Sequence, residues 1–190
     1  MRALPCLLIL ACCALCSVPL PAQADNSDSA RRALLTGSVV KVLDGDTLLV
    51  QLGKRHVRVH LSGVDAPEID QPWGRQAANA LSQMVLNQSV DMGPLRKDGF
   101  NRMTTIVFVG EEEVGAAMIR DGNAWADRDA LRASDASLCD VEARAREARR
   151  GLWSLPAPQR VAPWEYRRRL MRRHFTDYSN ETVTHCKGKH

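Results

Sequence analysis

The sequence has no internal repeats and little excess charge of either sign. It contains 190 residues, of which 45% are apolar and 25% are charged, as in soluble globular proteins. The absence of repeats excludes a repeat architecture, and the composition excludes a disordered or fibrous chain. The length is sufficient for one domain that buries a substantial core, and we find no boundary to a second domain.

Cysteine is scarce outside the first 24 residues. Four of the six cysteines lie in that segment, at Cys6, Cys12, Cys13 and Cys16. The other two, Cys139 and Cys186, are isolated in the sequence, so they do not make a metal site. In an exported chain such a pair predicts one disulfide, which would tie a late helical segment to the C-terminal tail. Two free thiols are the alternative.

No apolar run is long enough to span a membrane comfortably, but residues 1–24 have the pattern of a secretory signal peptide. Arg2 is followed by an uncharged, largely apolar stretch from Leu7 to Leu20, and Ala22-Gln23-Ala24 is a small-x-small cleavage site. We therefore expect export to a periplasm or to the medium, a loose leader over 25–36, and no membrane association after cleavage. An anchoring helix, or a lipoprotein modified at Cys12, is the alternative.

The net charge of +4 falls only to +3 when the signal segment is removed, because that segment contains a single charged residue, Arg2. This small excess does not by itself indicate a nucleic-acid partner. A C-terminal group of arginines is more suggestive, since it would either follow a phosphate backbone or form a solvated helix face. Its members are Arg160, Arg167, Arg168, Arg169, Arg172 and Arg173. We assign no structure to the basic tail over 167–190.

Hydrophobic periodicity predicts strands first and helices afterwards. Alternating patterns and turn residues indicate an antiparallel meander, and apolar residues at helical spacing indicate helices. This order predicts an α+β protein with a small closed barrel and helices at one end. The predicted strands are 37–43, 47–52, 56–61, 89–92 and 103–109, and the predicted helices are 74–86, 114–121 and 136–150. Prolines at 156, 158 and 163 are expected to interrupt regular structure.

Two acidic turns are the strongest candidates for a functional site. Asp44-Gly45-Asp46-Thr47 separates the first two predicted strands, and Asp65-Ala66-Pro67-Glu68 follows the third. At the rim of a barrel these turns would converge, and carboxylate and carbonyl oxygens are ligands that suit calcium. Taken alone, however, an Asp-Gly-Asp turn is more typical of an ordinary hairpin.

The order and spacing of several motifs make the chain resemble the staphylococcal nuclease (thermonuclease) family from about residue 37 to residue 166. The motifs are Lys41-Val42-Leu43-Asp44-Gly45-Asp46-Thr47, Gly63-Val64-Asp65-Ala66-Pro67-Glu68, Asp98-Gly99-Phe100-Asn101-Arg102, Ile119-Arg120-Asp121-Gly122, Gly151-Leu152-Trp153 and Pro163-Trp164. The resemblance implies a five-stranded OB-type barrel with about three helices. It also implies a Ca²⁺-dependent enzyme that cuts DNA and RNA phosphodiester bonds and leaves 3′-phosphates.

The resemblance assigns the metal site to the two acidic turns. Asp46 and Asp65 match the family's calcium carboxylates, and Ala66 matches a position whose backbone carbonyl faces the metal. Asp44 matches an outer acidic neighbour. We expect the chain to bind Ca²⁺ through these groups, to take nucleic acid as its partner, and to act as a monomer.

The resemblance also implies the catalytic roles: Glu68 matches the general base for the attacking water, and Arg102 matches one of two catalytic arginines. A guanidinium stabilises the negative charge that develops on the phosphate oxygens, and it stays charged. Phe100 stands where the family often has a tyrosine near the nucleotide, so we expect it to contact substrate by packing alone.

The sequence departs from the family at His60, which stands five residues before Asp65, where the second catalytic arginine is expected. A protonated His60 could donate to a phosphate oxygen, or it could simply fill the position. Arg58 lies two residues earlier on the same strand face, roughly 6–7 Å away, and could partly replace the missing arginine. We therefore expect a nuclease with weakened activity. A non-catalytic nucleic-acid-binding module is the main alternative, and an interaction protein that keeps only the fold is the weaker one.

Overall fold

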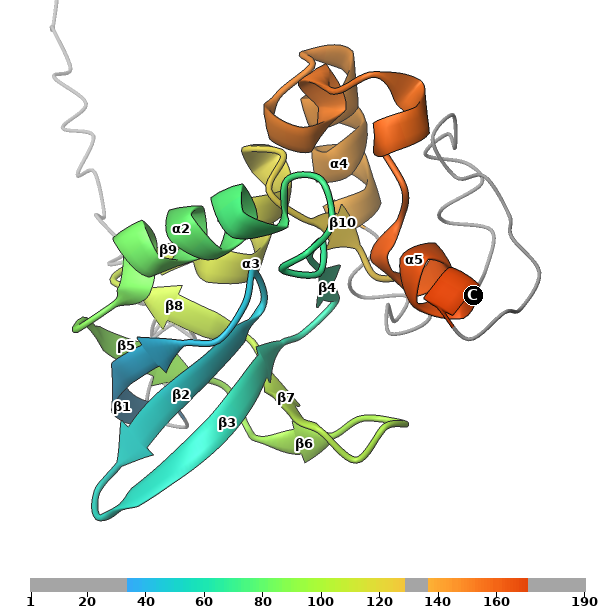
Figure 1. Cartoon of the computed structure of the whole chain (residues 1–190). Helices are drawn as coiled ribbons and strands as arrows, with labels where there is room; N and C mark the ends of the chain where they lie inside the picture. The colour runs from blue at the N-terminus through green and yellow to red at the C-terminus, as the bar shows by residue number, and fades with distance from the viewer. Residues whose placement is uncertain (1–33, 129–136, 171–190) are drawn as a thin grey trace, which may run out of the picture.

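The computed structural model describes residues 34–128 and 137–170, and its centre is a curved antiparallel meander. Strands β1 (Leu35–Val42), β2 (Thr47–Leu52) and β3 (Arg55–Leu61) follow one another in chain order (Figure 1). β1 pairs with β2 and β2 with β3, both antiparallel. Gly53 turns the chain between β2 and β3 with a φ of 58°, a left-handed conformation that glycine adopts without steric cost. All three strands were predicted within two residues of these bounds.

Short strands on both sides of the meander extend it into a mixed sheet with the order β6-β7-β3-β2-β1-β5-β8-β9. One flank holds β5 (Ser89–Met92), β8 (Val107–Val109) and β9 (Glu112–Glu113). The other holds β7 (Met103–Thr105), parallel to β3, and β6 (Arg96–Lys97). β4 (Val64–Asp65) and β10 (Trp125–Ala126) form a separate two-stranded ladder.

The segment predicted as one strand over 103–109 is divided at Ile106 into β7 and β8. β7 pairs with β3 while β8 pairs with β5, on opposite sides of the meander. One short stretch of chain therefore joins the two flanks and curls the sheet round, as in an OB-type barrel. Because β6 and β9 remain as the two edges of the hydrogen-bonded order, the described strands do not complete a closed ring.

Four α-helices lie among the described residues, and together with the sheet they confirm the predicted α+β class. They are α2 (Gly74–Val85), α3 (Val114–Arg120), α4 (Ser137–Glu147) and α5 (Pro163–Leu170), with short 3₁₀ helices at Gly151–Ser154 and Ala157–Gln159. α5 was not predicted. Pro163 begins this helix instead of interrupting it, because the first turn needs no N–H donor from that residue. The expected boundary between domain and tail after Tyr166 therefore falls inside a helix.

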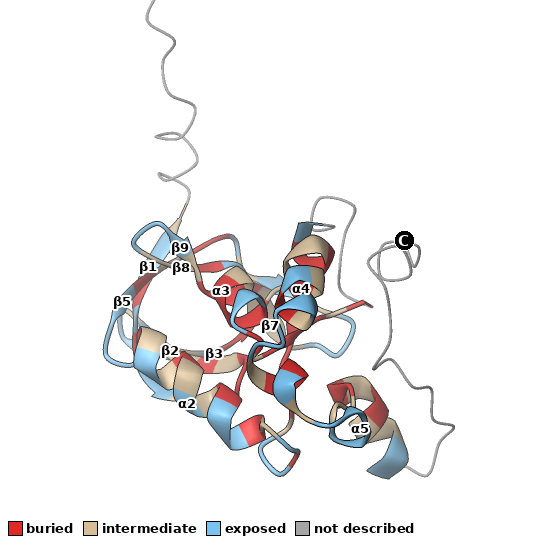
Figure 2. Ribbon diagram, turned by 90° about the horizontal axis from the view of Figure 1, so that it is seen from above, coloured by how far each residue is buried: buried red, intermediate tan, exposed pale blue. Residues whose placement is uncertain are grey.

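Two apolar clusters hold these elements together. The larger joins residues of the sheet, α2, α3 and the start of α4, and Figure 2 marks buried residues on these elements in red. The smaller gathers Trp125, Trp153 and Leu152 against Ala162, and so anchors the segment that leads into α5. Cys139 is buried in the larger cluster, but its predicted partner Cys186 lies outside the described residues, as do the signal segment and the basic tail beyond residue 170. No helix within 34–128 or 137–170 is long and apolar enough to cross a membrane.

Candidate active site

The two acidic turns meet, as the sequence predicts. In the first turn, the Asp44 carboxylate accepts a hydrogen bond from the Asp46 backbone N–H at 3.1 Å. Oδ2 of Asp46 then accepts one from the backbone N–H of Ala66, in the second turn, at 2.7 Å. Gly45 allows this close approach, because a Cβ there would lie 2.6 Å from the Cβ of Ala66 and 2.8 Å from that of Ala77.

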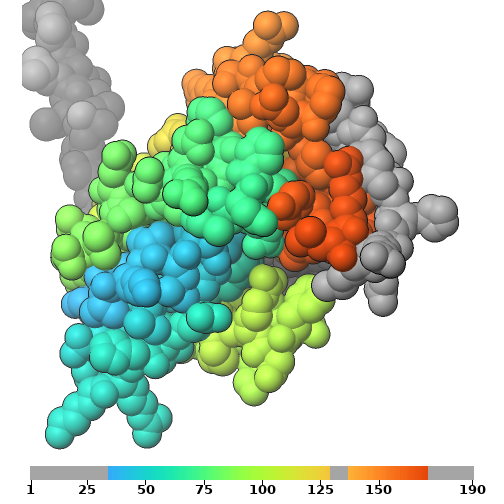
Figure 3. All heavy atoms as spheres, viewed as in Figure 1, coloured from blue at the N-terminus to red at the C-terminus, as the bar shows by residue number. Residues whose placement is uncertain are grey.

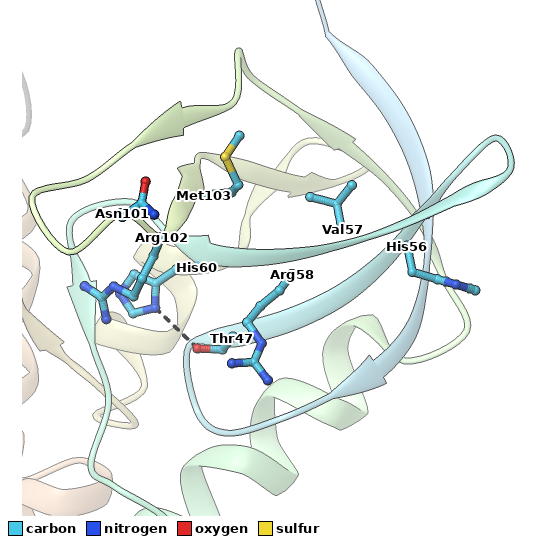
Figure 4. Close-up of a pocket in the computed structure, with 8 residues that line it drawn as sticks. All are labelled: Thr47, His56, Val57, Arg58, His60, Asn101, Arg102 and Met103. Carbon is cyan, nitrogen blue, oxygen red and sulfur yellow. Dashed lines mark hydrogen bonds between the residues drawn. The ribbon is translucent and has the colours of Figure 1, made fainter.

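His60 is buried and faces Asp46. Its Nδ1 lies 3.0 Å from Oδ1 of Asp46 and 3.3 Å from the hydroxyl of Thr47 (Figure 4). Burial acts to raise the pKa of Asp46, but the hydrogen bond and charge of His60 outweigh it and lower that pKa to about 2. Burial likewise opposes protonation of His60, yet contact with Asp46 raises its pKa. The histidine thus occupies the arginine position and orients a predicted metal ligand.

Asp65 is also buried, and Glu68 beside it is partly exposed. A guanidinium from α5 reaches both carboxylates: Arg167 bonds the two oxygens of Asp65 at 3.0 and 2.7 Å and Oε1 of Glu68 at 2.8 Å. Burial nevertheless raises the pKa of Asp65 to about 7, despite the opposing effect of Arg167. Burial and the charge of Asp46 also raise the pKa of Asp44 to about 6. Asp44 and Asp65 are therefore harder to ionise than ordinary carboxylates, whereas Asp46 stays ionised.

These groups line one cleft of about 510 Å³. Its walls contain Asp44, Asp46, Thr47, Arg58, Asp65, Ala66, Pro67, Glu68, Arg102 and Arg167, with Leu43 at the edge. All the predicted metal and catalytic residues except His60 are among them. His60 lines two neighbouring cavities instead, of which one also contains His56, Arg58 and Arg102 (Figure 4). Of the two candidates for the missing arginine, it is Arg58 that borders the cleft.

Arg102 is positioned by the loop between β6 and β7. Both its backbone N–H and its Nε bond the Asp98 carboxylate, at 2.8 and 2.6 Å. Asn101 takes a left-handed conformation with a φ of 63°, which asparagine tolerates. Phe100 is 77% exposed, and the Arg102 guanidinium lies 5.3 Å from its ring centroid. The aromatic face is thus open to solvent beside a predicted catalytic arginine.

The sequence reasoning missed Arg167 and Asp98. Arg167 was noted only as one of six C-terminal arginines, and nothing in their spacing distinguishes the one that folds back across 102 residues to Asp65. Asp98 carried a weak signal, because it stands four residues before Arg102 in a recognised motif.

The chain matches the family model described as "Staphylococcal nuclease homologue" over residues 58–155. It is 40% identical over 145 residues to Protein ParB of Escherichia coli, covering 72% of this chain and 81% of that protein. It is 34% identical over 160 residues to a micrococcal nuclease of Shigella flexneri, covering 80% and 86%. An uncharacterized endonuclease of Escherichia coli O157:H7 is 35% identical over 134 residues, covering 70% and 85%.

An α+β fold with a carboxylate-lined cleft and flanking arginines defines the class as a phosphodiester-hydrolysing nuclease, in agreement with these relatives. The chain belongs to the staphylococcal nuclease family. Both the family and the enzyme class predicted from the motifs are therefore confirmed.

Proposed function

We propose that the chain is an exported, Ca²⁺-dependent nuclease that hydrolyses phosphodiester bonds of DNA, RNA or both. The observation that carries this proposal is the gathering of two buried carboxylates, a partly exposed glutamate and three arginines around one cleft of about 510 Å³. Each group has a distinct use in hydrolysis at phosphorus, and nothing else in the described fold requires them to share a cleft.

The donor set fits a hard divalent cation. Asp46, Asp65 and the Ala66 carbonyl would hold it with oxygen atoms only, with Asp44 as an outer neighbour, as suits Ca²⁺. No three His, Cys, Asp or Glu side chains cluster for metal binding within the described ranges, so a main-chain oxygen and water would complete the coordination. Burial raises the pKa of Asp65 to about 7, and a bound cation would lower it and keep this carboxylate ionised.

Each protein group has a definable part in the reaction. Bound Ca²⁺ would supply positive charge to a non-bridging phosphate oxygen and lower the barrier. Glu68 accepts a proton from the water that attacks phosphorus, and the bond from phosphorus to the leaving oxygen breaks. Arg102, held by Asp98, donates N–H groups to the phosphate oxygens as charge develops on them. Arg58 supplies a second guanidinium from the adjacent wall, and His60 orients Asp46.

Hydrolysis of single-stranded DNA tests the enzymatic part of the proposal. We expect cutting by the purified protein with Ca²⁺, none with a chelator, and a loss of on the order of 10²–10⁴-fold in Glu68→Gln. Glu147→Gln is the matched control, because it removes the same charge from an exposed position on α4. Salt-sensitive DNA binding without any cutting would favour the alternative, a non-catalytic nucleic-acid-binding module.

Export is tested separately by the mass of the protein recovered from periplasm or medium. Cleavage after Ala24 would give a chain that begins at Asp25. An uncleaved chain in the membrane fraction would contradict this part of the proposal and leave the nuclease chemistry untouched.

A further inference from the structure

Helix α5 brings a residue into the cleft from beyond residues 58–155, the part of the chain that matches the family model. Arg167 lies on this helix and is about one-third exposed. One of its nitrogens, Nη1, is shared between Oδ1 of Asp65 and Oε1 of Glu68, while Nη2 bonds Oδ2 of Asp65. The planar fork of the guanidinium thus joins a predicted metal ligand to the predicted general base.

Further bonds hold the same two segments together. Gln71 is 5% exposed; its side-chain oxygen accepts the Glu68 N–H at 3.0 Å, and its side-chain nitrogen donates to the Val161 carbonyl at 2.8 Å. The Tyr166 hydroxyl donates to Asp70 at 3.0 Å. Figure 3 shows the red C-terminal segment against the green segment that carries the start of α2. The contact of Arg167 is therefore one part of a formed junction.

The Glu68 side chain depends on this junction for its position. Among the residues that the structure describes, Arg167 is the one side chain that bonds the Glu68 carboxylate. A glutamate without that bond would sample several rotamers, including ones that turn toward a cation on Asp65. A general base contributes only when it lies within hydrogen-bond reach of the water it deprotonates.

We propose that Arg167 is a positioning residue, which holds Glu68 as the general base and keeps it from becoming an additional cation ligand. This inference rests on the proposed function. It predicts opposite effects of Arg167 on cation binding and on the reaction rate. The positive charge of Arg167 also opposes a cation on Asp65, so removal of the guanidinium strengthens cation binding while it slows the reaction.

The test compares Arg167→Ala with the wild type and with Arg120→Ala. Arg120 is a matched control, because it is ion-paired with two carboxylates, Glu112 and Asp121, that do not line the cleft. Ca²⁺ affinity is measured by calorimetry without substrate, and kcat and KM are measured on single-stranded DNA. We expect Arg167→Ala to bind Ca²⁺ about two- to fivefold more tightly and to lose about 10–100-fold in kcat with little change in KM.

Two further measurements separate positioning from a structural role. Arg167→Lys keeps the charge but not the two-sided fork, so its kcat should lie between those of the wild type and Arg167→Ala. Added methylguanidine should partly restore kcat in Arg167→Ala and should not affect Arg120→Ala.

The results that would contradict the positioning role can be told apart from those that would contradict the proposed function. Weaker Ca²⁺ binding together with lower kcat in Arg167→Ala would mean a structural role, and a higher kcat would mean that Arg167 blocks the site; either result overturns the proposal. If the wild type itself does not cut, the proposed function has failed. If the wild type and Arg167→Ala cut equally well, only the positioning role has failed.

Discussion

Arg58 and His60 lie two residues apart on β3, yet they meet different neighbours. Arg58 is exposed and borders the carboxylate cleft, whereas His60 is buried against Asp46 and Thr47. The two side chains therefore do different things. Arg58 presents a guanidinium to the cleft, and the His60 imidazole contacts Asp46, a predicted metal ligand.

Replacement of Arg58 by Ala should consequently lower kcat/KM on single-stranded DNA by on the order of 10²-fold, the effect of losing one charged donor to a developing oxyanion. Arg55→Ala is the control, because Arg55 lies on the same strand and is exposed but does not line the cleft. Equal activities in the two variants would show that Arg58 acts only through the general positive charge of the strand, as Arg55 does, and not by contact with the phosphate.

The same reasoning explains what an arginine at position 60 would do. Arg58→Ala with His60→Arg should cut faster than Arg58→Ala alone, since a guanidinium again reaches the cleft from β3. Equal rates in the double and single variants would mean that position 60 no longer faces the phosphate.

At the scale of elements, the β6–β7 loop presents an exposed aromatic side chain, that of Phe100, beside Arg102. Phe100→Ala should raise KM for single-stranded DNA by about 5- to 150-fold, because stacking of a base on an aromatic ring contributes about 1–3 kcal/mol. The free energy of unfolding should not change, as Phe100 is 77% exposed. Leu35→Ala removes an exposed apolar side chain that lines none of the three cavities and should leave KM unchanged.

Some of these elements can be predicted from the sequence, and others cannot. The meander, α2 and α3 follow from local periodicity, and the acidic turns follow from their motifs. The break at Ile106 does not, because alternation along one segment cannot indicate that its halves pair with different strands. Likewise, the position of Arg167 depends on how α5 packs against Asp65 and Glu68. No local sequence pattern indicates this packing.

At the scale of the whole molecule, a buried charge network joins the barrel to the C-terminal helices. Glu142 on α4 bonds both ends of the Arg128 guanidinium at 2.9 Å, the Nε of Arg146 at 2.7 Å and the Ala126 N–H at 2.6 Å. Arg128 also lies 5.2 Å from the ring centroid of Trp164 on α5. Loss of this network should therefore loosen the whole fold.

Glu142→Gln should lower the free energy of unfolding by about 3–5 kcal/mol near pH 7, since it leaves buried arginines without a carboxylate. Burial would raise the pKa of Glu142, but Arg128 and Arg146 lower it below its ordinary 4.5. The stabilisation is thus complete above about pH 4.5 and is lost as the pH falls through the lower native pKa.

Urea unfolding of the wild type and Glu142→Gln near pH 7 and near pH 3 measures this difference. A gap that stays constant with pH would contradict the assignment of a lowered pKa. Glu147→Gln, on the same helix and exposed, should show no comparable gap at either pH.

The contact between Arg167 and Asp65 also has a consequence for the order in which the molecule is made. The two residues are separated by 102 positions, and a ribosome adds roughly 5–20 residues each second. A growing chain therefore carries both acidic turns for roughly 5–20 s before the arginine that joins Asp65 to Glu68 exists. If Arg167 acts as proposed, a partly made chain has the carboxylates of a nuclease but not its positioned base, and full activity requires the synthesis of α5.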